Sequence, residues 1–336
     1  MKPSLVKATL KARFEANIHR TPYVIGPPGL GKTQIMAQIA SELGVGFKAL
    51  HAPTLQPEDI AMPVISSDRG SVRFVVPTER FPMESSDCHE AGILLIDELP
   101  QSDSSTQKTM ANLIQEREIH GHKIKDKWMI VATGNRKTDG AGANRVLTHL
   151  MNRMTEINME PDFEDWCAWY MRQPDMRVEG LSFIRFKPNL LCDFNPQRDV
   201  NPTPRAWVEG VFASLGAVPA EAELEVFKGD VGEGPASEFK SFLNIYRNLP
   251  DPDEVIANPV KHKMPTEPSV LFALSGALAT RATKANFAEI MKFANRMPPE
   301  FCAILVKDAL NGKERLDETK AFTDWALGAG SKLWRD

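Results

Sequence analysis

The chain has 336 residues, of which 42% are hydrophobic and 25% are charged, and its formal net charge is −4. This length allows two or three packed modules, and the composition is typical of a soluble globular protein. No apolar run approaches the roughly 20 residues of a membrane span, so we expect no membrane insertion, and no export signal is evident. The negative net charge gives no global attraction to nucleic acid, although a local stripe of basic residues is still possible.

The cysteines are scattered singly through the chain. They lack the paired spacing that builds a zinc site or a disulfide framework. This usage is typical of a reducing compartment, so we expect a cytoplasmic protein. The four positions are Cys88, Cys167, Cys192 and Cys302.

The first segments predict a helix, a strand, a loop and a second helix. Leu5, Ala8, Ala12 and Ile18 recur among Lys and Arg residues and predict a short amphipathic helix between Pro3 and His19. An apolar Tyr-Val-Ile run follows Pro22 and leads into a loop rich in Gly and Pro. Apolar residues then recur at every fourth place from Lys32 to Leu43, and Gly44 supplies a helix stop.

The next segments alternate strands with helices up to about residue 160. This order favours an α/β fold with a doubly wound parallel sheet. An alternating pattern around Gly70 predicts a β-hairpin, which we interpret as an insertion at about residues 62–80. The wholly apolar strand 93–96 is typical of a parallel strand buried on both faces. The further expected elements are a strand at 45–50, a helix at 104–117, a turn at Gly121 and a strand at 128–132.

Beyond Pro161 the apolar spacing becomes helical. We expect an α/β domain at 1–160, an all-helical lid at 161–250, and a linker with a C-terminal helical extension at 251–336. The stretch Leu249–Pro268 contains five prolines and is the candidate linker or extended arm. The expected helices lie near 164–171, 178–191, 204–215, 239–248, 270–279, 287–293 and 300–310.

The loop from Gly26 to Thr33 satisfies the P-loop pattern of Gly, four residues, and Gly-Lys-Ser/Thr, between a strand and a helix. Its glycines let successive N–H groups converge on phosphate oxygens near the positive end of the helix. Lys32 adds a charge for the β- and γ-phosphates, and Thr33 offers a hydroxyl ligand to Mg²⁺. A chance match of a glycine-rich turn is the weaker interpretation. The predicted ATP-binding residues are Gly26, Pro27, Pro28, Gly29, Leu30, Gly31, Lys32, Thr33 and Gln34.

Two further strands end in polar residues at the edge where open α/β sheets place their ligands. The strand 93–96 ends in Asp97 and Glu98, which we expect to hold the metal and to polarise the attacking water. Asn135 ends the next strand, where its amide could orient that water. Taken alone, a Gly-Asn pair after a strand is more simply a turn.

Together the P-loop, the Asp97-Glu98 pair and Asn135 resemble the AAA+ superfamily, and the details resemble its MoxR branch, over roughly residues 20–215. The resemblance implies that Asn135 is the sensor-1 residue. It also implies that an arginine near the end of the ATPase domain acts on the nucleotide of a neighbouring subunit. Arg153 occupies that place, in the segment Leu150-Met151-Asn152-Arg153-Met154, and Arg145 is the alternative candidate. The family has a Phe after this arginine, whereas this chain has Met154.

The same resemblance implies a sensor-2 role for Arg205, in Pro202-Thr203-Pro204-Arg205-Ala206-Trp207. Thr203 is a good N-cap and Pro204 a good first helical residue, so Arg205 would project from a rigid helix start. Without the family, an isolated arginine here would more often be a surface charge.

The function that these residues imply is a ring ATPase, by resemblance a hexamer, that requires ATP and Mg²⁺ and remodels or activates a protein partner. In the family, such a partner often carries a von Willebrand factor A domain. A DNA- or RNA-associated motor or loader is the first alternative. It is kept open by basic residues near the hairpin (Arg73) and near the second turn (Arg117, Lys123, Lys125 and Lys127). A nucleotide-gated scaffold with negligible turnover is the second.

Three other features have structural interpretations. His120 and His122 have a spacing that could bind a metal, but a solvated hairpin tip is the simpler prediction. The aromatic group of Trp166, Trp169 and Tyr170 predicts core packing in the lid rather than base stacking. The acidic stretch Glu221–Glu225 predicts a solvated helix face.

Overall fold

The computed structural model describes residues 1–65, 70, 72–136, 139, 146–312, 314–328 and 330. The chain folds into two compact units, which we describe separately. The first comprises Met1–Asp162 and Phe194–Asp199, and the second comprises Phe163–Asp193 and Val200–Asp336.

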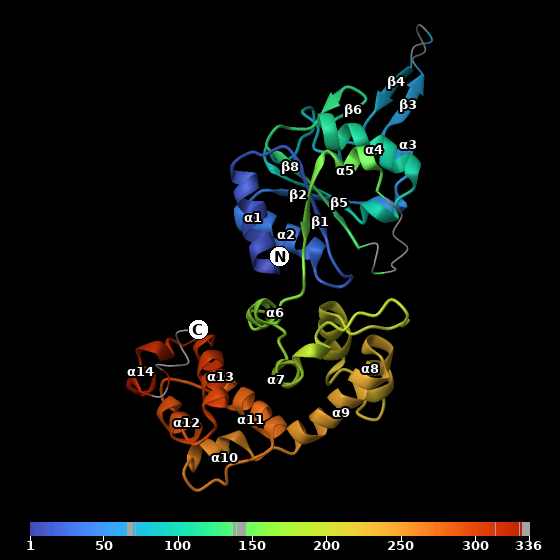
Figure 1. Cartoon of the computed structure of the whole chain (residues 1–336). Helices are drawn as coiled ribbons and strands as arrows, with labels where there is room; N and C mark the ends of the chain where they lie inside the picture. The colour runs from blue at the N-terminus through green and yellow to red at the C-terminus, as the bar shows by residue number, and fades with distance from the viewer. Residues whose placement is uncertain are drawn as a thin grey trace. The chain divides into compact units, whose positions relative to one another are not determined.

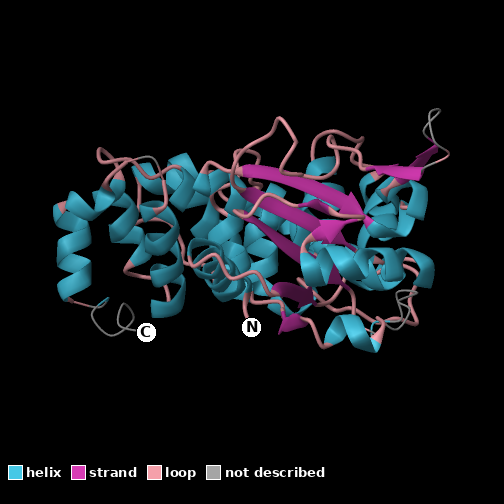
Figure 2. Cartoon of the chain, turned by 90° about the horizontal axis from the view of Figure 1, so that it is seen from above, coloured by secondary structure: helices cyan, strands magenta, loops and turns pink. Residues whose placement is uncertain are grey.

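The centre of the first unit is a five-stranded parallel sheet, seen in Figure 2, with the strand order β2-β5-β8-β1-β9. This confirms the predicted α/β fold. The edge strand β9 was not predicted, because Met154 and Ile157 are its only buried side chains and they do not alternate with polar residues. The strands are β1 (Thr21–Ile25), β2 (Gly46–His51), β5 (Gly92–Asp97), β8 (Trp128–Gly134) and β9 (Met154–Asn158).

Each face of the sheet has its own core, as a doubly wound fold requires. Alternate side chains of β5 point to the two faces of the sheet. Ile93 and Leu95 belong to the core formed with helices α1 (Pro3–Glu15) and α2 (Lys32–Leu43). Leu94 and Ile96 belong to the opposite core, which includes helix α4 (Ser104–Glu116). This explains why the segment contains no polar residue before Asp97. Helix α1 ends earlier than predicted, and Asn17 follows it with a positive φ of 48°.

Two small hairpins stand beside this sheet. The predicted insertion is confirmed as β3 (Met62–Ile65) paired antiparallel with β4 (Val72–Val75), while residues 66–69 and 71 lie outside the described part. The second hairpin joins β6 (Glu118–Ile119) to β7 (His122–Lys123) through Gly121, whose φ is +83°. The remaining short helices of this unit are η1 (Ala52–Thr54), α3 (Pro57–Ile60), η2 (Leu99–Gln101) and α5 (Thr148–Met151).

The second unit is helical throughout its described residues. Helix α7 ends at Phe186 rather than at the predicted Leu191, because Pro188 disfavours a helical residue before it. The predicted linker Leu249–Pro268 contains helix α10, whose Val255 is buried. The elements are α6 (Phe163–Tyr170), α7 (Val178–Phe186), η4 (Pro188–Leu190), η5 (Ala206–Phe212), α8 (Glu223–Val231), α9 (Glu233–Arg247), α10 (Pro252–Ala257), α11 (Pro268–Thr280), α12 (Phe287–Ala294), α13 (Pro299–Leu310), η6 (Leu316–Glu318) and α14 (Lys320–Leu327).

An aromatic core holds the first helices of this unit together. Trp166 and Tyr170 are buried and stack at 5.0 Å between ring centroids, which confirms core packing for this cluster. The prediction for the acidic stretch was wrong at Glu223. That carboxylate is buried, and it accepts hydrogen bonds from Lys240 (2.7 Å) and Arg247 (2.6 and 2.9 Å), both on α9.

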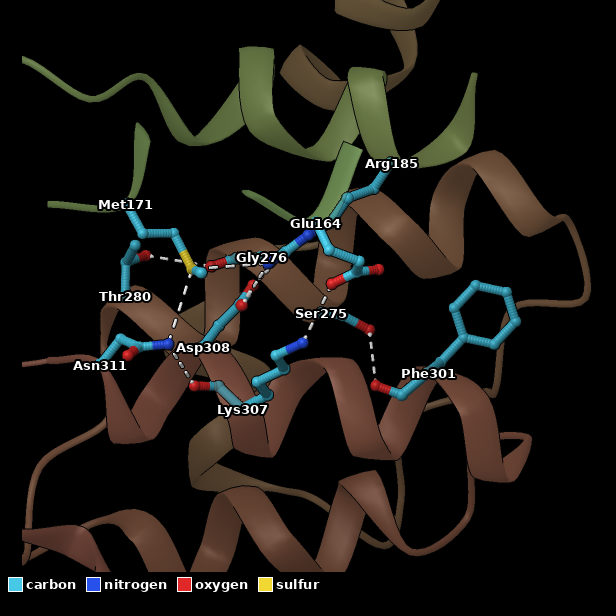
Figure 3. A network of polar contacts seen from close by, with 10 residues as sticks. All are labelled: Glu164, Met171, Arg185, Ser275, Gly276, Thr280, Phe301, Lys307, Asp308 and Asn311. Carbon is cyan, nitrogen blue, oxygen red and sulfur yellow. Dashed lines mark hydrogen bonds and ion pairs between the residues drawn. The ribbon is translucent and has the colours of Figure 1, made fainter. Parts of the chain in front are cut away.

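A buried polar network joins α7 to the C-terminal helices (Figure 3). Arg185 on α7 forms a bidentate ion pair with Asp308 on α13, and both side chains are less than 10% exposed. Nearby, α11 approaches α7 so closely that a Cβ at Gly276 would lie 2.4 Å from Ser182 Oγ. The C-terminal helices therefore pack on α7 as part of one unit. Across the described ranges, no helix is long and apolar enough to cross a membrane.

Candidate active site

The P-loop lies at the carboxyl edge of the central sheet, between β1 and α2. Gly29 and Gly31 adopt positive φ values of 71° and 80°, a region in which a side chain would be strained. Gly26 is required for a different reason, because a Cβ there would lie 2.6 Å from the carbonyl oxygen of Met159. Leu30 is buried in the core beneath the loop, whereas Gln34 is exposed.

Lys32 is buried, and its ammonium group is held by oxygen atoms. Its Nζ donates to the carbonyl oxygens of Gly26 (2.8 Å) and Pro27 (2.9 Å) and to Asn135 Oδ1 (2.9 Å). Asn135 follows β8, the neighbour of β1 in the sheet. The structure thus brings together two predicted residues that lie 103 positions apart in the chain.

Asp97 lies beside the hydroxyl of Thr33. Thr33 Oγ1 donates to Asp97 Oδ2 at 2.7 Å, and Thr133 Oγ1 donates to Asp97 Oδ1. Glu98 has a positive φ of 56°, which is rare for a residue with a side chain. Its backbone N–H donates to Thr133 Oγ1 at 3.3 Å. The Thr33 hydroxyl and the Asp97 carboxylate therefore meet where β5 ends, and such oxygen donors suit a hard divalent cation.

Three residues that the sequence analysis missed support this edge. His51 ends β2, and its Nε2 lies 3.7 Å from Glu98 Oε2. Thr133 contacts both acidic residues as described above. Arg136 donates to Asn158 Oδ1 and to the carbonyl oxygen of Met159, which joins the ends of β8 and β9. The pairing register of the strands would have indicated His51, because His51 is the partner of Asp97 in the β2–β5 pair. That register is not visible in the sequence.

Arg153 and Arg205 are the predicted arginines that the structure describes. Arg153 precedes β9 at the amino edge of the sheet, and its Nη1 donates to the carbonyl oxygen of His149. Arg145 lies outside the described residues. Arg205, in the second unit, is exposed and lies 3.9 Å from Glu209. The Thr203 cap is confirmed, since Thr203 Oγ1 accepts from the backbone N–H of Ala206 at 3.1 Å.

His120 and His122 belong to the contact between the two hairpins. The His120 ring stacks on Phe74 at 3.9 Å, and His122 Nε2 lies 3.0 Å from the Phe74 carbonyl oxygen. Where side chains are described, no group of three His, Cys, Asp or Glu residues is arranged to hold a metal ion. The two histidines therefore join the hairpins.

Residues 22–160 match the model of the ATPase family associated with various cellular activities, AAA. This part of the chain is similar to AAA ATPase domains. Among curated proteins, RuvB 1, a Holliday junction branch migration complex subunit of Synechococcus sp. (strain JA-3-3Ab), is 41% identical over 80 residues, which are 24% of this chain and 21% of the relative. The corresponding RuvB of Parabacteroides distasonis is 49% identical over 51 residues, or 15% of each chain. The chain thus matches about a fifth or less of the length of these relatives.

Solved structures are similar at low sequence identity. A point mutant of Thermotoga maritima RuvB is 18% identical, with 81% of this chain and 79% of that chain covered and a TM-score of 0.38. A putative ATPase from Cytophaga hutchinsonii is 15% identical, with 90% and 80% covered and a TM-score of 0.36.

The residues of this site fit a nucleoside triphosphate with Mg²⁺. At Gly26 the P-loop backbone comes so close to Met159, the residue after β9, that no side chain could be accommodated there. Lys32 supplies a buried positive charge, and Thr33 with Asp97 supplies oxygen donors of the kind that Mg²⁺ binds. Thr33 and Asp97 would hold the ion, which would supply positive charge against the charge that develops on the phosphate oxygens.

Proposed function

We propose that the chain is a Mg²⁺-dependent ATPase that hydrolyses ATP to ADP and phosphate. The observation that carries this proposal is the convergence of Lys32, Asn135, Thr33, Asp97 and Glu98 at one edge of the sheet. Two hydrogen bonds between side chains, Lys32 to Asn135 and Thr33 to Asp97, connect the start of α2 to the ends of β8 and β5, which are distant in sequence.

Each residue has a separate role in this proposal. The backbone N–H groups of the P-loop and the Lys32 ammonium hold the phosphates, and Thr33 and Asp97 hold the metal. Glu98 accepts a proton from the attacking water, for which its carboxylate is 39% exposed. Asn135 orients that water. Gly26 to Gly31 and Gln34 complete the nucleotide-binding segment.

The place of Arg153 supports a ring of subunits with ATP bound at the interfaces. Parallel strands separate the two edges of the sheet, so an arginine before β9 faces away from the carboxyl edge at which Lys32 lies. We infer that Arg153 serves the nucleotide of a neighbouring subunit. Arg205 would act from the helical unit as the sensor-2 residue. The MoxR resemblance favours a hexamer.

The hairpin β3–β4 favours a protein partner. It projects from the first unit (Figure 1), and its described side chains apart from Arg73 are apolar and exposed, with Ile65 76% exposed. Contiguous exposed apolar groups are typical of protein-interaction sites. We propose that ATP turnover remodels or activates a protein held in part by this hairpin, and a von Willebrand factor A domain protein is the partner that the MoxR resemblance suggests. The exposed residues are Met62, Val64, Ile65, Val72, Phe74 and Val75.

A nucleic-acid motor is the second candidate, because the RuvB relatives are subunits of a Holliday junction complex. Arg73 is the one basic residue among the described positions of β3 and β4. Stimulation of hydrolysis by DNA that falls steeply with salt would favour this candidate over a protein remodeller.

The test compares Lys32→Ala with Glu98→Gln, and the exposed Glu84→Gln is the matched control. Lys32→Ala should abolish binding of a fluorescent ATP analogue. Glu98→Gln should bind it as wild type does and lose hydrolysis, and Glu84→Gln should retain both. Equal loss of binding in the two site variants would contradict the assigned roles. Wild-type protein that binds and assembles with ATP yet shows no turnover would favour the nucleotide-gated scaffold.

A further inference from the structure

The hydroxyl of Thr133 connects both acidic residues of the candidate active site. Thr133 Oγ1 donates to Asp97 Oδ1 and accepts a hydrogen bond from the backbone N–H of Glu98 at 3.3 Å. A hydroxyl has one proton and two lone pairs, and an ionised carboxylate only accepts hydrogen bonds, so the two bonds can form together. One side chain of β8 thus contacts the residue expected to bind the metal and the backbone of the residue expected to polarise water.

The alternation of side chains along two neighbouring strands explains this contact. Val131 of β8 and Leu95 of β5 both belong to the core on the side of α2. Side chains two places apart on a strand point to the same face, so Thr133 and Asp97 point to that side as well. The strand register pairs the residues that immediately precede them. Thr33, at the start of α2, lies on the same side, 2.7 Å from Asp97.

The turn that follows β5 depends on the same contact. Glu98 has a positive φ of 56°, and such a conformation persists only where surrounding contacts hold it. Its N–H is bound by Thr133, and its carbonyl oxygen accepts from the N–H of Gln101 at 2.9 Å. The turn also lies against the end of β8, because a Cβ at Gly134 would be 2.6 Å from Pro100 Cδ. The direction in which Glu98 projects is therefore fixed in part from β8.

Thr133 does not itself reach a ligand, because its exposed fraction is 0%. Thr33 also donates to Asp97, but we expect the Thr33 oxygen to hold the metal. Thr133 therefore differs from Thr33 in that it supports Asp97 from within the sheet. Loss of the Thr133 hydroxyl would remove a donor from Asp97 and would remove the acceptor of the Glu98 N–H.

We propose that Thr133 is a positioning residue of the proposed ATPase, which aligns the Asp97 carboxylate for Mg²⁺ and the Glu98 carboxylate for the attacking water. The inference rests on the proposed function and deepens it, because the alignment of both acids depends on one hydroxyl that touches no ligand. Mg²⁺ requires near-ideal octahedral geometry, so a rotated Asp97 carboxylate binds it less well. Glu98 must lie within hydrogen-bond reach of its water, so a change in its turn slows the chemical step.

Two substitutions separate the hydroxyl of Thr133 from its packing. Thr133→Val keeps the shape and loses the hydroxyl, whereas Thr133→Ser keeps the hydroxyl and loses the buried methyl group. At saturating Mg²⁺, Thr133→Val should lower kcat by about 10- to 100-fold with a much smaller change in KM, the effect of a lost hydrogen bond to a charged group. Thr133→Ser should keep most of the rate. A loss in Thr133→Ser as large as that in Thr133→Val would assign the effect to packing and overturn the proposal.

Thr21 supplies a matched control on the neighbouring strand β1. It is also 0% exposed, and its hydroxyl has no hydrogen-bond partner in the described structure. Thr21→Val should therefore keep the wild-type kcat. If Thr21→Val loses as much activity as Thr133→Val, the effect belongs to any buried threonine of the sheet and the proposal fails.

Two further measurements do not depend on turnover. In nucleotide-free protein, Thr133→Val should accelerate hydrogen exchange of the Glu98 amide, followed by mass spectrometry of peptides that end on either side of it, because that N–H loses its acceptor. Thr133→Ser should exchange as wild type does. The Mg²⁺ concentration for half-maximal binding of a fluorescent ATP analogue should rise about tenfold in Thr133→Val. A binding stoichiometry equal to that of wild type at saturating Mg²⁺ shows that the variant is folded.

Faster exchange at Glu98 with unchanged kcat and unchanged Mg²⁺ dependence would make the contact purely structural and overturn the proposal. Unchanged exchange in Thr133→Val would overturn it as well. Failure of the ATPase function itself is distinguishable, because wild type would then show no Lys32-dependent hydrolysis even where the difference in exchange is present.

Discussion

The Lys32 ammonium donates a 2.9 Å hydrogen bond to the Asn135 side chain, which ties the start of α2 to the end of β8. Asn135 is itself buried. The pair couples the residue that we expect to hold phosphate to the residue that we expect to orient water, and it motivates the first prediction.

We predict that Asn135→Ala lowers kcat for ATP hydrolysis by about 10- to 100-fold and changes ATP affinity much less, because the amide contributes to the transition state more than to binding. Steady-state kinetics and a direct binding measurement provide the test. Asn244→Ala, which removes an exposed amide in the second unit, is the control. A loss of affinity as large as the loss of kcat would show that Asn135 acts mainly through Lys32 in the ground state.

Thr33 should set the requirement for Mg²⁺. Its hydroxyl already lies 2.7 Å from Asp97, so the two oxygens can bind one ion together. Thr33→Ala should raise the Mg²⁺ concentration for half-maximal hydrolysis by about tenfold, the effect of one lost ligand contact. Thr33→Ser keeps the hydroxyl and should behave as wild type does. Identical Mg²⁺ titrations for the Ala and Ser variants would exclude this role.

His51 is predicted to position Glu98 from the neighbouring strand, at 3.7 Å. His51→Ala should lower kcat several-fold with little change in KM for ATP, whereas His51→Asn, which keeps a donor, should restore part of the rate. The combination of His51→Ala with Glu98→Gln should be no slower than Glu98→Gln alone, because residues that act as a unit are not additive. If the losses in kcat of the two single variants add up in the double variant, the two residues act independently.

The ion pair of Arg185 and Asp308 should be a large determinant of the stability of the second unit. Burial raises the pKa of Asp308, so a lone carboxylate at this position is costly. Arg185→Met should destabilise by about 3–5 kcal/mol, and Arg185→Met with Asp308→Leu should recover much of that loss. Urea unfolding of the two variants measures the difference. A double variant that is less stable than the single variant would contradict the buried-charge argument.

Glu223 should make the stability of the second unit dependent on acid pH. Its hydrogen bonds from Arg247 and Lys240 lower its pKa below the ordinary glutamate value of 4.5. Since the unfolded chain binds the proton more readily, this contribution is present at neutral pH and is lost as pH falls below about 4.5 through the lowered folded-state value.

The measurement compares unfolding midpoints of wild type and Glu223→Gln between pH 7 and pH 3. Glu223→Gln should lower the free energy of unfolding by about 1–3 kcal/mol at pH 7, because hydrogen bonds to a charged group are lost. The difference in stability between wild type and Glu223→Gln should become smaller at acid pH. Glu225→Gln, on the same helix and 76% exposed, is the matched control and should change little. A constant difference across this pH range would assign the effect of Glu223 to packing.

Local patterns predicted most of the first unit. The apolar run at 93–96 and the Gly44 stop after α2 were visible because burial and helix termination leave signals within a few residues. Strand β9 gave no such signal, since an edge strand needs only two buried side chains. The prediction for Glu223 failed because its partners lie 17 and 24 residues away on another helix.

The sequence by itself determined the chemical identity of the P-loop and of the Asp97-Glu98 pair, because a fixed spacing of glycines, a lysine and a hydroxyl is a property of consecutive residues. Only the tertiary structure decided that His51 contacts Glu98 and that Arg20 lies beside Arg153. Those relationships depend on which strands are neighbours and in which register they pair. Register is set by the packing of the whole sheet between its two cores.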